Sequence, residues 1–243
     1  MSTVTIATGT IERQISDVRI RHWLLDALTV SSGSIDSISF LGLGKVFTAF
    51  MTGNVAFLGM GIAGNPVPRI VSVLASMAGF AVGIYFATRI TSSDKQKSGV
   101  TWSPRTTFAL GVSLLAHLCF VAIWFATSGR PGASAVPILL AVWALAMGLQ
   151  SGAVRKLHVE GIFTTAATGT FIVLASDLVN WGLTRDERRR YRGVLISLVI
   201  GATAGAYLFF HAPIFAPVLP LVITAGVAVT AARVQWSSDA PAA

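Results

Sequence analysis

The sequence predicts an all-α fold, a polytopic membrane helix bundle made of two related halves, and three observations support this prediction. First, 53% of the residues are hydrophobic and 12% are charged, with a mean hydropathy of +0.72, whereas soluble domains carry about 25% charged residues. Second, apolar runs recur at lengths near the roughly 20 residues that a spanning helix needs. Third, FTAFMTGN at 47–54 returns as FTTAATGT at 163–170, and GFAVGIY at 79–85 returns as GATAGAY at 201–207. Two repeats in the same order indicate an internal duplication.

Eight apolar segments follow one another along the chain. They lie at 23–43, 46–63, 70–91, 106–127, 135–154, 163–182, 193–211 and 214–233. The third, fourth, seventh and eighth are plain spanning candidates. The first is more polar because it holds Asp26, Asp36 and several serines. The second is short and is followed by the helix-breaking GNPVP, and the sixth contains a TG motif and then Asp177.

The distribution of the basic residues across the membrane discriminates between two topologies. Lys and Arg collect on the cytoplasmic side of membrane proteins. If all eight segments cross, Arg89, Lys95, Lys97 and Arg105 fall outside together with Lys45, Arg155 and Lys156. If 46–63 and 163–182 are instead broken or re-entrant, six segments cross. Only Lys45, Arg69 and Arg130 of the 18 basic residues then lie outside. We therefore expect six crossings plus two re-entrant TG segments, with both termini in the cytoplasm of a bacterial inner membrane.

This topology divides the chain into four parts: a cytoplasmic tail at 1–22, a first repeat at 23–127, a second repeat at 135–233 and a cytoplasmic tail at 234–243. Residues 1–18 and 235–243 are expected to be flexible. Segment 23–43 runs outward while its counterpart 135–154 runs inward, so the repeats are inverted. Transporters often use inverted repeats with broken helices and a site at the midplane. One TG turn would then enter from each side, and the two would meet near the centre.

The TG elements are the first candidate binding site, comprising Thr52, Gly53, Asn54, Thr168, Gly169 and Thr170. Glycine permits a sharp turn, and Thr or Asn can cap a helix that starts just after them. A half-helix N-terminus offers free N–H donors and partial positive charge. Two such ends would suit an anion or a dipolar neutral solute. The alternative is an ordinary kinked helix in which glycine allows close packing.

Three further polar residues join the candidate site. Asp36 is an intramembrane carboxylate, which is costly and is by default a functional hypothesis; the alternative is a structural hydrogen bond to serine or to a broken-helix N-terminus. Asp177 follows the second TG motif and either faces the cavity or approaches the cytoplasmic interface. Gln150 is a candidate polar partner in the second half.

These residues resemble a known family signature. GSIDSISFLGLGKVFTAFMTGNVAFLG, with Gly33, Asp36, Phe47 and the run Met51–Asn54, resembles the YoaK-like family, a large group of uncharacterised bacterial multi-pass inner-membrane proteins. GLQSG and TTAATGT resemble its second-half pattern, except that Ser151 stands where an Asn is usual. The resemblance covers about 22–232. It implies a multi-pass bacterial membrane protein and no particular substrate.

Together these features predict a small-solute transporter or channel, with a non-transporting membrane scaffold or partner subunit as the alternative. An enzyme is not expected, because no nucleophile and base pair, metal-ligand spacing or nucleotide motif is present. No cofactor or metal is expected, and the single cysteine, Cys119, leaves no intramolecular disulfide. The expected partners are the bilayer and an unidentified solute. The net charge of +8 reflects topology rather than nucleic-acid binding, and the run at 185–192 suits anionic lipid headgroups. The GxxxG pairs at 79/83 and 201/205 suit packing within or between protomers.

Overall fold

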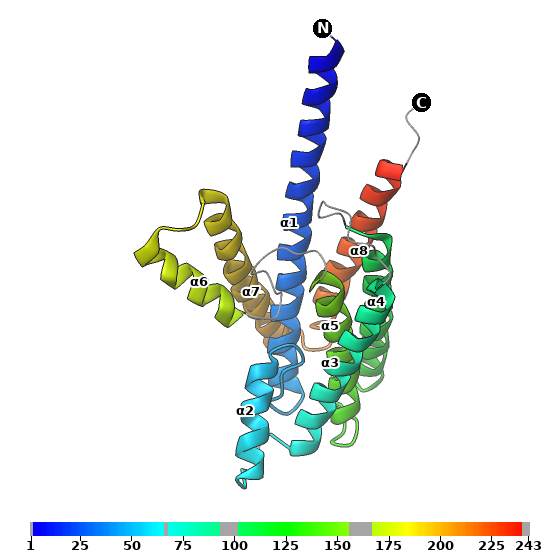
Figure 1. Cartoon of the computed structure of the whole chain (residues 1–243). Helices are drawn as coiled ribbons and strands as arrows, with labels where there is room; N and C mark the ends of the chain where they lie inside the picture. The colour runs from blue at the N-terminus through cyan, green and yellow to red at the C-terminus, as the bar shows by residue number, and fades with distance from the viewer. Residues whose placement is uncertain (1, 66–67, 93–101, 156–166, 240–243) are drawn as a thin grey trace.

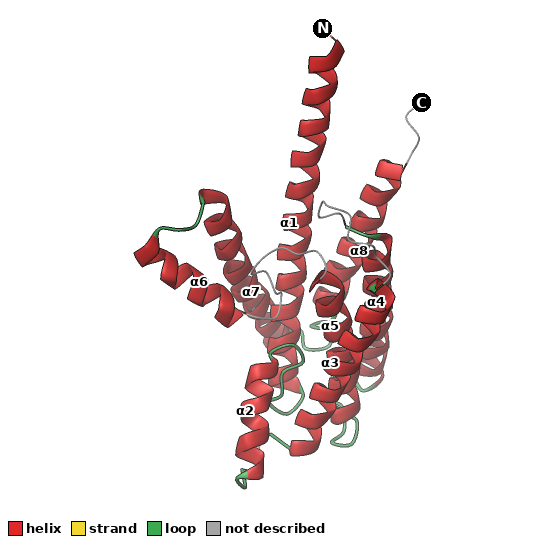
Figure 2. Cartoon of the chain, in the orientation of Figure 1, coloured by secondary structure: helices red, strands yellow, loops and turns green. Residues whose placement is uncertain are grey.

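The chain folds into a bundle of α-helices (Figures 1 and 2). The computed structural model describes residues 2–65, 68–92, 102–155 and 167–239, and every regular element within those ranges is a helix. In order these are α1 (Ser2–Gly42), α2 (Met51–Ile62), α3 (Ile70–Thr91), α4 (Pro104–Ala126), α5 (Val136–Arg155), α6 (Ala167–Asn180), α7 (Arg185–His211) and α8 (Val218–Asp239). The all-α prediction is confirmed.

Five of the described helices are long and apolar enough to cross a membrane. They are α3, α4, α5, α7 and the stretch Pro213–Val234, which includes most of α8. α2 and α6 are apolar but shorter, as expected for the two segments that carry TG motifs. α1 is more polar than the five candidate spans because it carries two aspartates and a run of serines within its apolar part. The helices support a multi-pass membrane protein.

Local sequence signals start two of these helices. Ser103 caps α4 by accepting a hydrogen bond from the Thr106 N–H, and Pro104 occupies the first turn, where its missing N–H costs nothing. Thr184 starts α7 with a capping box, in which its hydroxyl accepts from the Glu187 N–H and the Glu187 carboxylate accepts from the Thr184 N–H.

The helices pack in pairs that join the two halves of the chain. α3 packs along α5 and α1 along α7; α4 lies against α5 and α8, and α8 against α1. α5 is the most buried of the five candidate spans. Figure 1 shows the start of α1 and the end of α8 at one end of the bundle and α2 at the other, while α6 projects sideways and packs on α7.

The first GxxxG pair lets two helix backbones touch. A Cβ added at Gly79 or Gly83 would collide with the carbonyl oxygens of Ala141 and Leu145, respectively, on α5. Such contact between backbones is a means by which membrane helices associate without a hydrophobic driving force.

The second GxxxG pair does the same between α7 and α1. A Cβ at Gly201 would collide with the carbonyl of Val30, and one at Gly205 would lie 2.6 Å from the carbonyl oxygen of Ser34. Both GxxxG faces are therefore used inside the chain.

A cluster of aromatic rings fills the core between α4 and α5. The Phe120 and Trp143 rings stack with centroids 3.6 Å apart, and Trp124 stacks on Phe120. The Trp143 indole N–H donates to Nδ1 of the buried His117 at 3.1 Å. The ring contacts fix the α4–α5 pair, and the hydrogen bond satisfies the indole away from water.

The two ends that the sequence predicts to be flexible tails are helical where the structure describes them, and their flexibility stays a prediction. α1 begins at Ser2 and α8 continues to Asp239. The N-terminal stretch contains no proline and only one glycine before residue 33, so nothing in its sequence breaks a helix that continues into the bundle.

Candidate functional site

The chain reverses direction between α1 and α2, and the turn lies earlier than predicted. Gly44 and Lys45 have φ angles of 82° and 67°, in the left-handed region. Gly53, the predicted turn residue, lies inside α2. A glycine at 44 accepts this conformation without steric cost, and it is followed by the extended stretch that leads to α2.

Asp36 holds the backbone of this corner. Its Oδ1 atom accepts hydrogen bonds from the Thr48 and Ala49 N–H groups, both at 2.8 Å, and from the Thr48 hydroxyl at 3.4 Å. Asp36 belongs to α1, whereas Thr48 and Ala49 directly precede α2. The carboxylate therefore lies where the free donors and partial positive charge of the α2 N-terminus are found.

Asn54 fastens the same corner from the other side. Its Oδ1 accepts from the Phe47 N–H at 3.1 Å, and its Nδ2 donates to the Phe47 carbonyl at 2.7 Å and to the Ser76 hydroxyl at 3.3 Å. Ser76 on α3 in turn donates to the Phe47 carbonyl at 2.6 Å. Asn54 is fully buried, and this paired set of bonds satisfies its amide.

Aromatic rings explain why residue 53 is a glycine. Phe47 stacks on Phe40 with ring centroids 4.9 Å apart and meets Phe50 edge to face at 5.2 Å. A Cβ at Gly53 would lie 2.7 Å from the Phe50 ring and 3.0 Å from the Phe47 ring. The glycine provides room for the rings rather than a turn, since it sits in regular helix.

The predicted capping by Thr52 and Asn54 was also wrong. α2 starts at Met51, its N-cap is Phe50, and no side chain makes a cap hydrogen bond there. Thr52 lies in the first turn and is exposed. The motif therefore forms the first turn of the helix, and the Asp36 carboxylate of α1 instead binds the backbone N–H groups of Thr48 and Ala49 just before it.

The second TG element has the same position in its helix but different surroundings. α6 starts at Ala167, so Thr168, Gly169 and Thr170 again form the first turn. Thr168 and Gly169 are exposed and Thr170 is buried. Among the described residues, no atom outside the local helix lies within 4 Å of a Cβ placed at Gly169. The preceding part of this copy, 163–166, lies outside the described residues.

Figure 1 shows α2 running from the middle of the bundle to its lower end, and α6 running outward from the side of the bundle. The TG residues lie in the first turn of each helix, which is its inner end. The expectation that the two TG turns come together near the centre stays a prediction. α2 packs on α3 and α6 packs on α7, so α3 fixes the position of the first TG element and α7 that of the second.

Asp177 joins α6 to α7. Its Oδ2 accepts from Arg188 Nε at 2.6 Å, and its Oδ1 accepts from the Leu183 N–H at 2.9 Å. The hydrogen bond from Arg188, and after it that from Leu183, holds the pKa of Asp177 below its usual value. The structure places Asp177 at the corner between α6 and α7, where the Arg188 guanidinium also lies 5.6 Å from the Trp181 ring. Both alternatives, a cavity position and a position at the cytoplasmic interface, stay predictions.

Gln150 lies between α5 and α1. Its Nε2 donates to the Leu28 carbonyl at 3.3 Å, while its Oε1 is buried and has no hydrogen-bond partner among the described residues. Ser32, one turn after Leu28, also has a buried hydroxyl without a partner in that part of the chain. This polar pair is separate from both TG elements.

Two contributors to the site were not predicted. Ser76 bonds to the Phe47 carbonyl, and its only sequence signal is a polar residue in the apolar run of α3. The Phe47 backbone itself gives no compositional signal. Among the described residues no group of three or more His, Cys, Asp or Glu side chains is placed to hold a metal ion.

Comparison with known proteins agrees with an apolar helical bundle in a membrane. The family model described as "Protein of unknown function (DUF1275)" matches residues 24–230. The chain belongs to the DUF1275 family. It is also similar to the UPF0700 transmembrane protein YoaK of Bacillus subtilis (strain 168), with 29% identity over 221 residues, which cover 87% of this chain and 94% of YoaK. No solved structure matches the chain. The matched region includes α2, α6 and every described polar residue of the candidate site, so the resemblance inferred from MTGN is confirmed.

Proposed function

We propose that this DUF1275 protein is a small-solute transporter or channel with an inverted repeat, in which the two TG elements form the moving parts of the pathway. The solute class is a small anion or a dipolar neutral molecule. In this proposal the described conformation is closed at the first TG element. The pocket seen on α7 contains no TG residue among its lining.

The helix contacts support the inverted repeat. If α1–α4 and α5–α8 are exchanged, the α3–α5 contact becomes α7–α1, α4–α5 becomes α8–α1, and α2–α3 becomes α6–α7; all six contacts occur. The glycine contacts follow the same rule, since Gly79 and Gly201 each touch the backbone of the exchanged partner helix. A pseudo-two-fold arrangement of this kind is typical of transporters with inverted repeats.

The position of the ends supports an even number of crossings, six or eight. The start of α1 and the end of α8 lie at the same end of the bundle (Figure 1). The arginine-rich start of α7 lies near that end, whereas Lys45 and Arg69 flank α2 at the other. This distribution matches the positive-inside rule in a bacterial inner membrane.

The observation that carries the transport proposal is the Asp36 carboxylate at the N-terminus of a short, broken membrane segment. Thr48 and Ala49 give this carboxylate the N–H bonds that an anionic or dipolar solute would need. A solute carboxylate or similar group could replace Asp36 there with little change in hydrogen bonding. In this proposal the Asp36 carboxylate occupies the solute's binding position, and its displacement by the solute frees α2 to move.

Flux in proteoliposomes tests the proposal. Full-length protein is reconstituted and screened with small anions and dipolar neutral solutes. The variants Asp36→Asn and Asn54→Ala are compared with the wild type. Asp26→Asn is the control, because it alters a carboxylate of α1 away from the corner between α1 and α2. We expect Asp36→Asn and Asn54→Ala to change flux at least tenfold and the control to change it less than twofold. Asp36→Asn keeps the side-chain shape, so a correctly inserted variant with normal flux would remove Asp36 from the mechanism.

A scaffold or partner subunit is the second candidate. The observation in its favour is that Asp36 and Asn54 are bonded to the protein itself and that both GxxxG faces close helix contacts within the chain. For a scaffold, no solute in the screen would cross faster with the protein than in empty liposomes. Cross-linking in native membranes would then capture a partner on the exposed apolar faces.

A further inference from the structure

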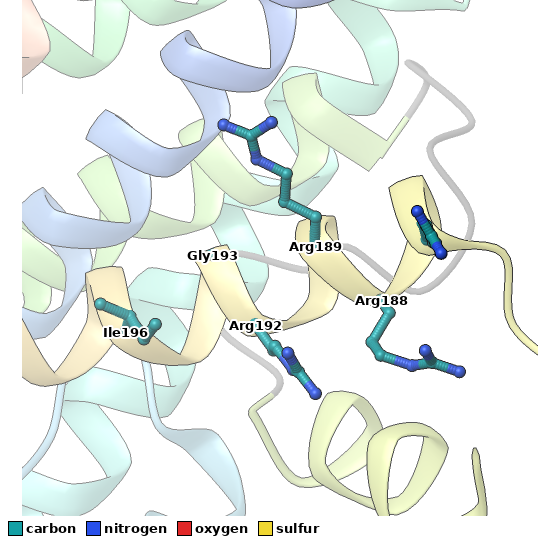
Figure 3. Close-up of a pocket in the computed structure, with 6 residues that line it drawn as sticks. Arg188, Arg189, Arg192, Gly193 and Ile196 are labelled. Carbon is teal, nitrogen blue, oxygen red and sulfur yellow. The ribbon is translucent and has the colours of Figure 1, made fainter.

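A pocket on the first turns of α7 gathers arginine side chains (Figure 3). It has a volume of about 430 Å³, and its lining consists of Arg185, Arg188, Arg189, Arg192, Gly193 and Ile196. Figure 3 shows Arg189 directed to one side of the pocket and Arg188 and Arg192 to the other. The guanidinium groups therefore flank an opening on the helix surface.

The helix register creates this arrangement. Residues 185, 189, 192 and 196 recur at spacings of three and four, which place them along one face of α7. The Thr184–Glu187 capping box fixes where the helix begins, and the buried Tyr191 turns the opposite face toward the bundle. A Cβ at Gly193 would lie 3.4 Å from the Asp26 carboxylate of α1, so this glycine lets α7 lie close to α1 behind the pocket.

The charge of the pocket is not balanced by its own lining. No lining residue is acidic. Arg188 is engaged by Asp177, and Glu187 lies 4.0 Å from Arg190, outside the pocket. Within the described part of the chain, Arg185, Arg189 and Arg192 have no ion-pair partner. Arg192 acts on the Asp177 carboxylate only at longer range. Guanidinium groups bind phosphate through paired charge-assisted hydrogen bonds, so three arginines without an ion pair favour a phosphate ligand.

The surface around the pocket is apolar. Ile196 is 58% exposed, and Val199 and Ile200 continue the exposed face along α7. On α6, beside it, Phe171, Leu178 and Val179 are 65%, 72% and 79% exposed. A soluble anion would use none of this surface, whereas the acyl chains of a lipid would cover it.

We propose that this pocket binds the phosphate headgroup of an anionic phospholipid, whose acyl chains lie along the exposed faces of α6 and α7. The arginines lie at the headgroup level and the apolar residues at the level of the chains. Charge complementarity selects an anionic over a zwitterionic lipid. The lipid would also contact both helices at once and so hold α6 beside the bundle.

Native mass spectrometry of the full-length protein in detergent tests this site. Phosphatidylglycerol, phosphatidylcholine and inorganic phosphate are titrated separately into the wild type, into Arg189→Gln/Arg192→Gln, and into Arg89→Gln/Arg233→Gln. The last variant removes the same charge from exposed arginines of α3 and α8 outside the pocket. We expect the wild type to bind phosphatidylglycerol at least tenfold more tightly than phosphatidylcholine, the pocket variant to lose this preference, and the control to keep it within twofold.

The variant Ile196→Asn tests whether the ligand is a lipid or a free anion. It makes the apolar part of the pocket lining polar and leaves the arginines in place, so the affinity for phosphatidylglycerol should fall at least threefold. Equal phosphatidylglycerol binding by wild type and pocket variant would overturn the site. Inorganic phosphate that displaces the lipid at equal concentration, or lipid binding unaffected by Ile196→Asn, would show that the occupant is a soluble anion and would overturn the lipid assignment. All four residues changed in the arginine variants are exposed, and a melting curve of each variant checks that it is folded.

Discussion

In the first half of the chain, the TG element is fastened on several sides: Asp36 holds the backbone before α2, and Asn54 joins that backbone to α3 through Ser76. In the second half, Thr168 and Gly169 are exposed, and α6 packs on α7 alone among its main contacts. One repeated motif therefore supports a tightly fixed helix in one place and a lightly held helix in the other. The motif specifies where the helix begins, and residues outside it decide how firmly the helix is held.

The largest expected effect is an all-or-none difference in accessibility between the ends of the two TG helices. In a Cys119→Ser background, cysteines at Ala63 after α2 and at Gly182 after α6 are labelled with a membrane-impermeant maleimide. Six crossings place residue 63 outside and residue 182 inside. Gly132→Cys, in the corner between α4 and α5, should react from outside like residue 63. Labelling of residues 63 and 132 only after permeabilisation would support eight crossings and remove the inverted repeat.

The next effect compares Asn54 with its counterpart Thr170. Asn54→Ala removes the two bonds to the Phe47 backbone and leaves buried polar groups unpaired, which costs about 2–4 kcal/mol. Thr170→Ala removes one hydroxyl, at about 1 kcal/mol or less. Unfolding midpoints in mild detergent measure both. Equal losses would show that the two copies are held equally firmly and that the comparison is wrong.

The two TG glycines should respond with opposite signs. Gly53→Ala pushes a methyl group into the Phe47 and Phe50 rings, and such overpacking costs about 1–3 kcal/mol. Gly169→Ala meets no neighbouring atom and improves helix propensity, for a gain of up to about 1 kcal/mol. The same unfolding assay checks the pair. Destabilisation by Gly169→Ala would mean that α6 is packed more closely than its described contacts indicate.

The helical class could be predicted from sequence because hydropathy and charge distribution follow directly from the bilayer. The positions of the site residues could not be predicted in the same way. A glycine that permits a turn and a glycine that makes room for rings look identical in sequence, so Gly53 was assigned the role that belongs to Gly44. Asp36 was identified as an unusual buried carboxylate, and one of its predicted alternatives, a hydrogen bond to a helix N-terminus, agrees with its bonds from the Thr48 and Ala49 N–H groups just before α2.

The smallest effect concerns the corner that holds α6. The pKa of Asp177 is lowered from its ordinary value of 3.8, chiefly by the hydrogen bond from Arg188. A carboxyl group with a lowered folded-state pKa stabilises the fold above its unfolded-state pKa, and this contribution is lost as the pH falls through the folded value. The pKa of Glu187, at the same corner, is lowered by its hydrogen bonds from Thr184, so Glu187 must be varied separately.

Because the contribution of Asp177 is lost at low pH, pepsin cleavage between α6 and α7 should accelerate as the pH falls below about 3.8. Asp177→Asn should be cut rapidly even at the upper end of the pepsin range, while Glu187→Gln should retain part of the pH dependence. If Asp177→Asn keeps the full wild-type pH profile, the Asp177–Arg188 bond does not hold α6, and the contacts along α7 must do so instead.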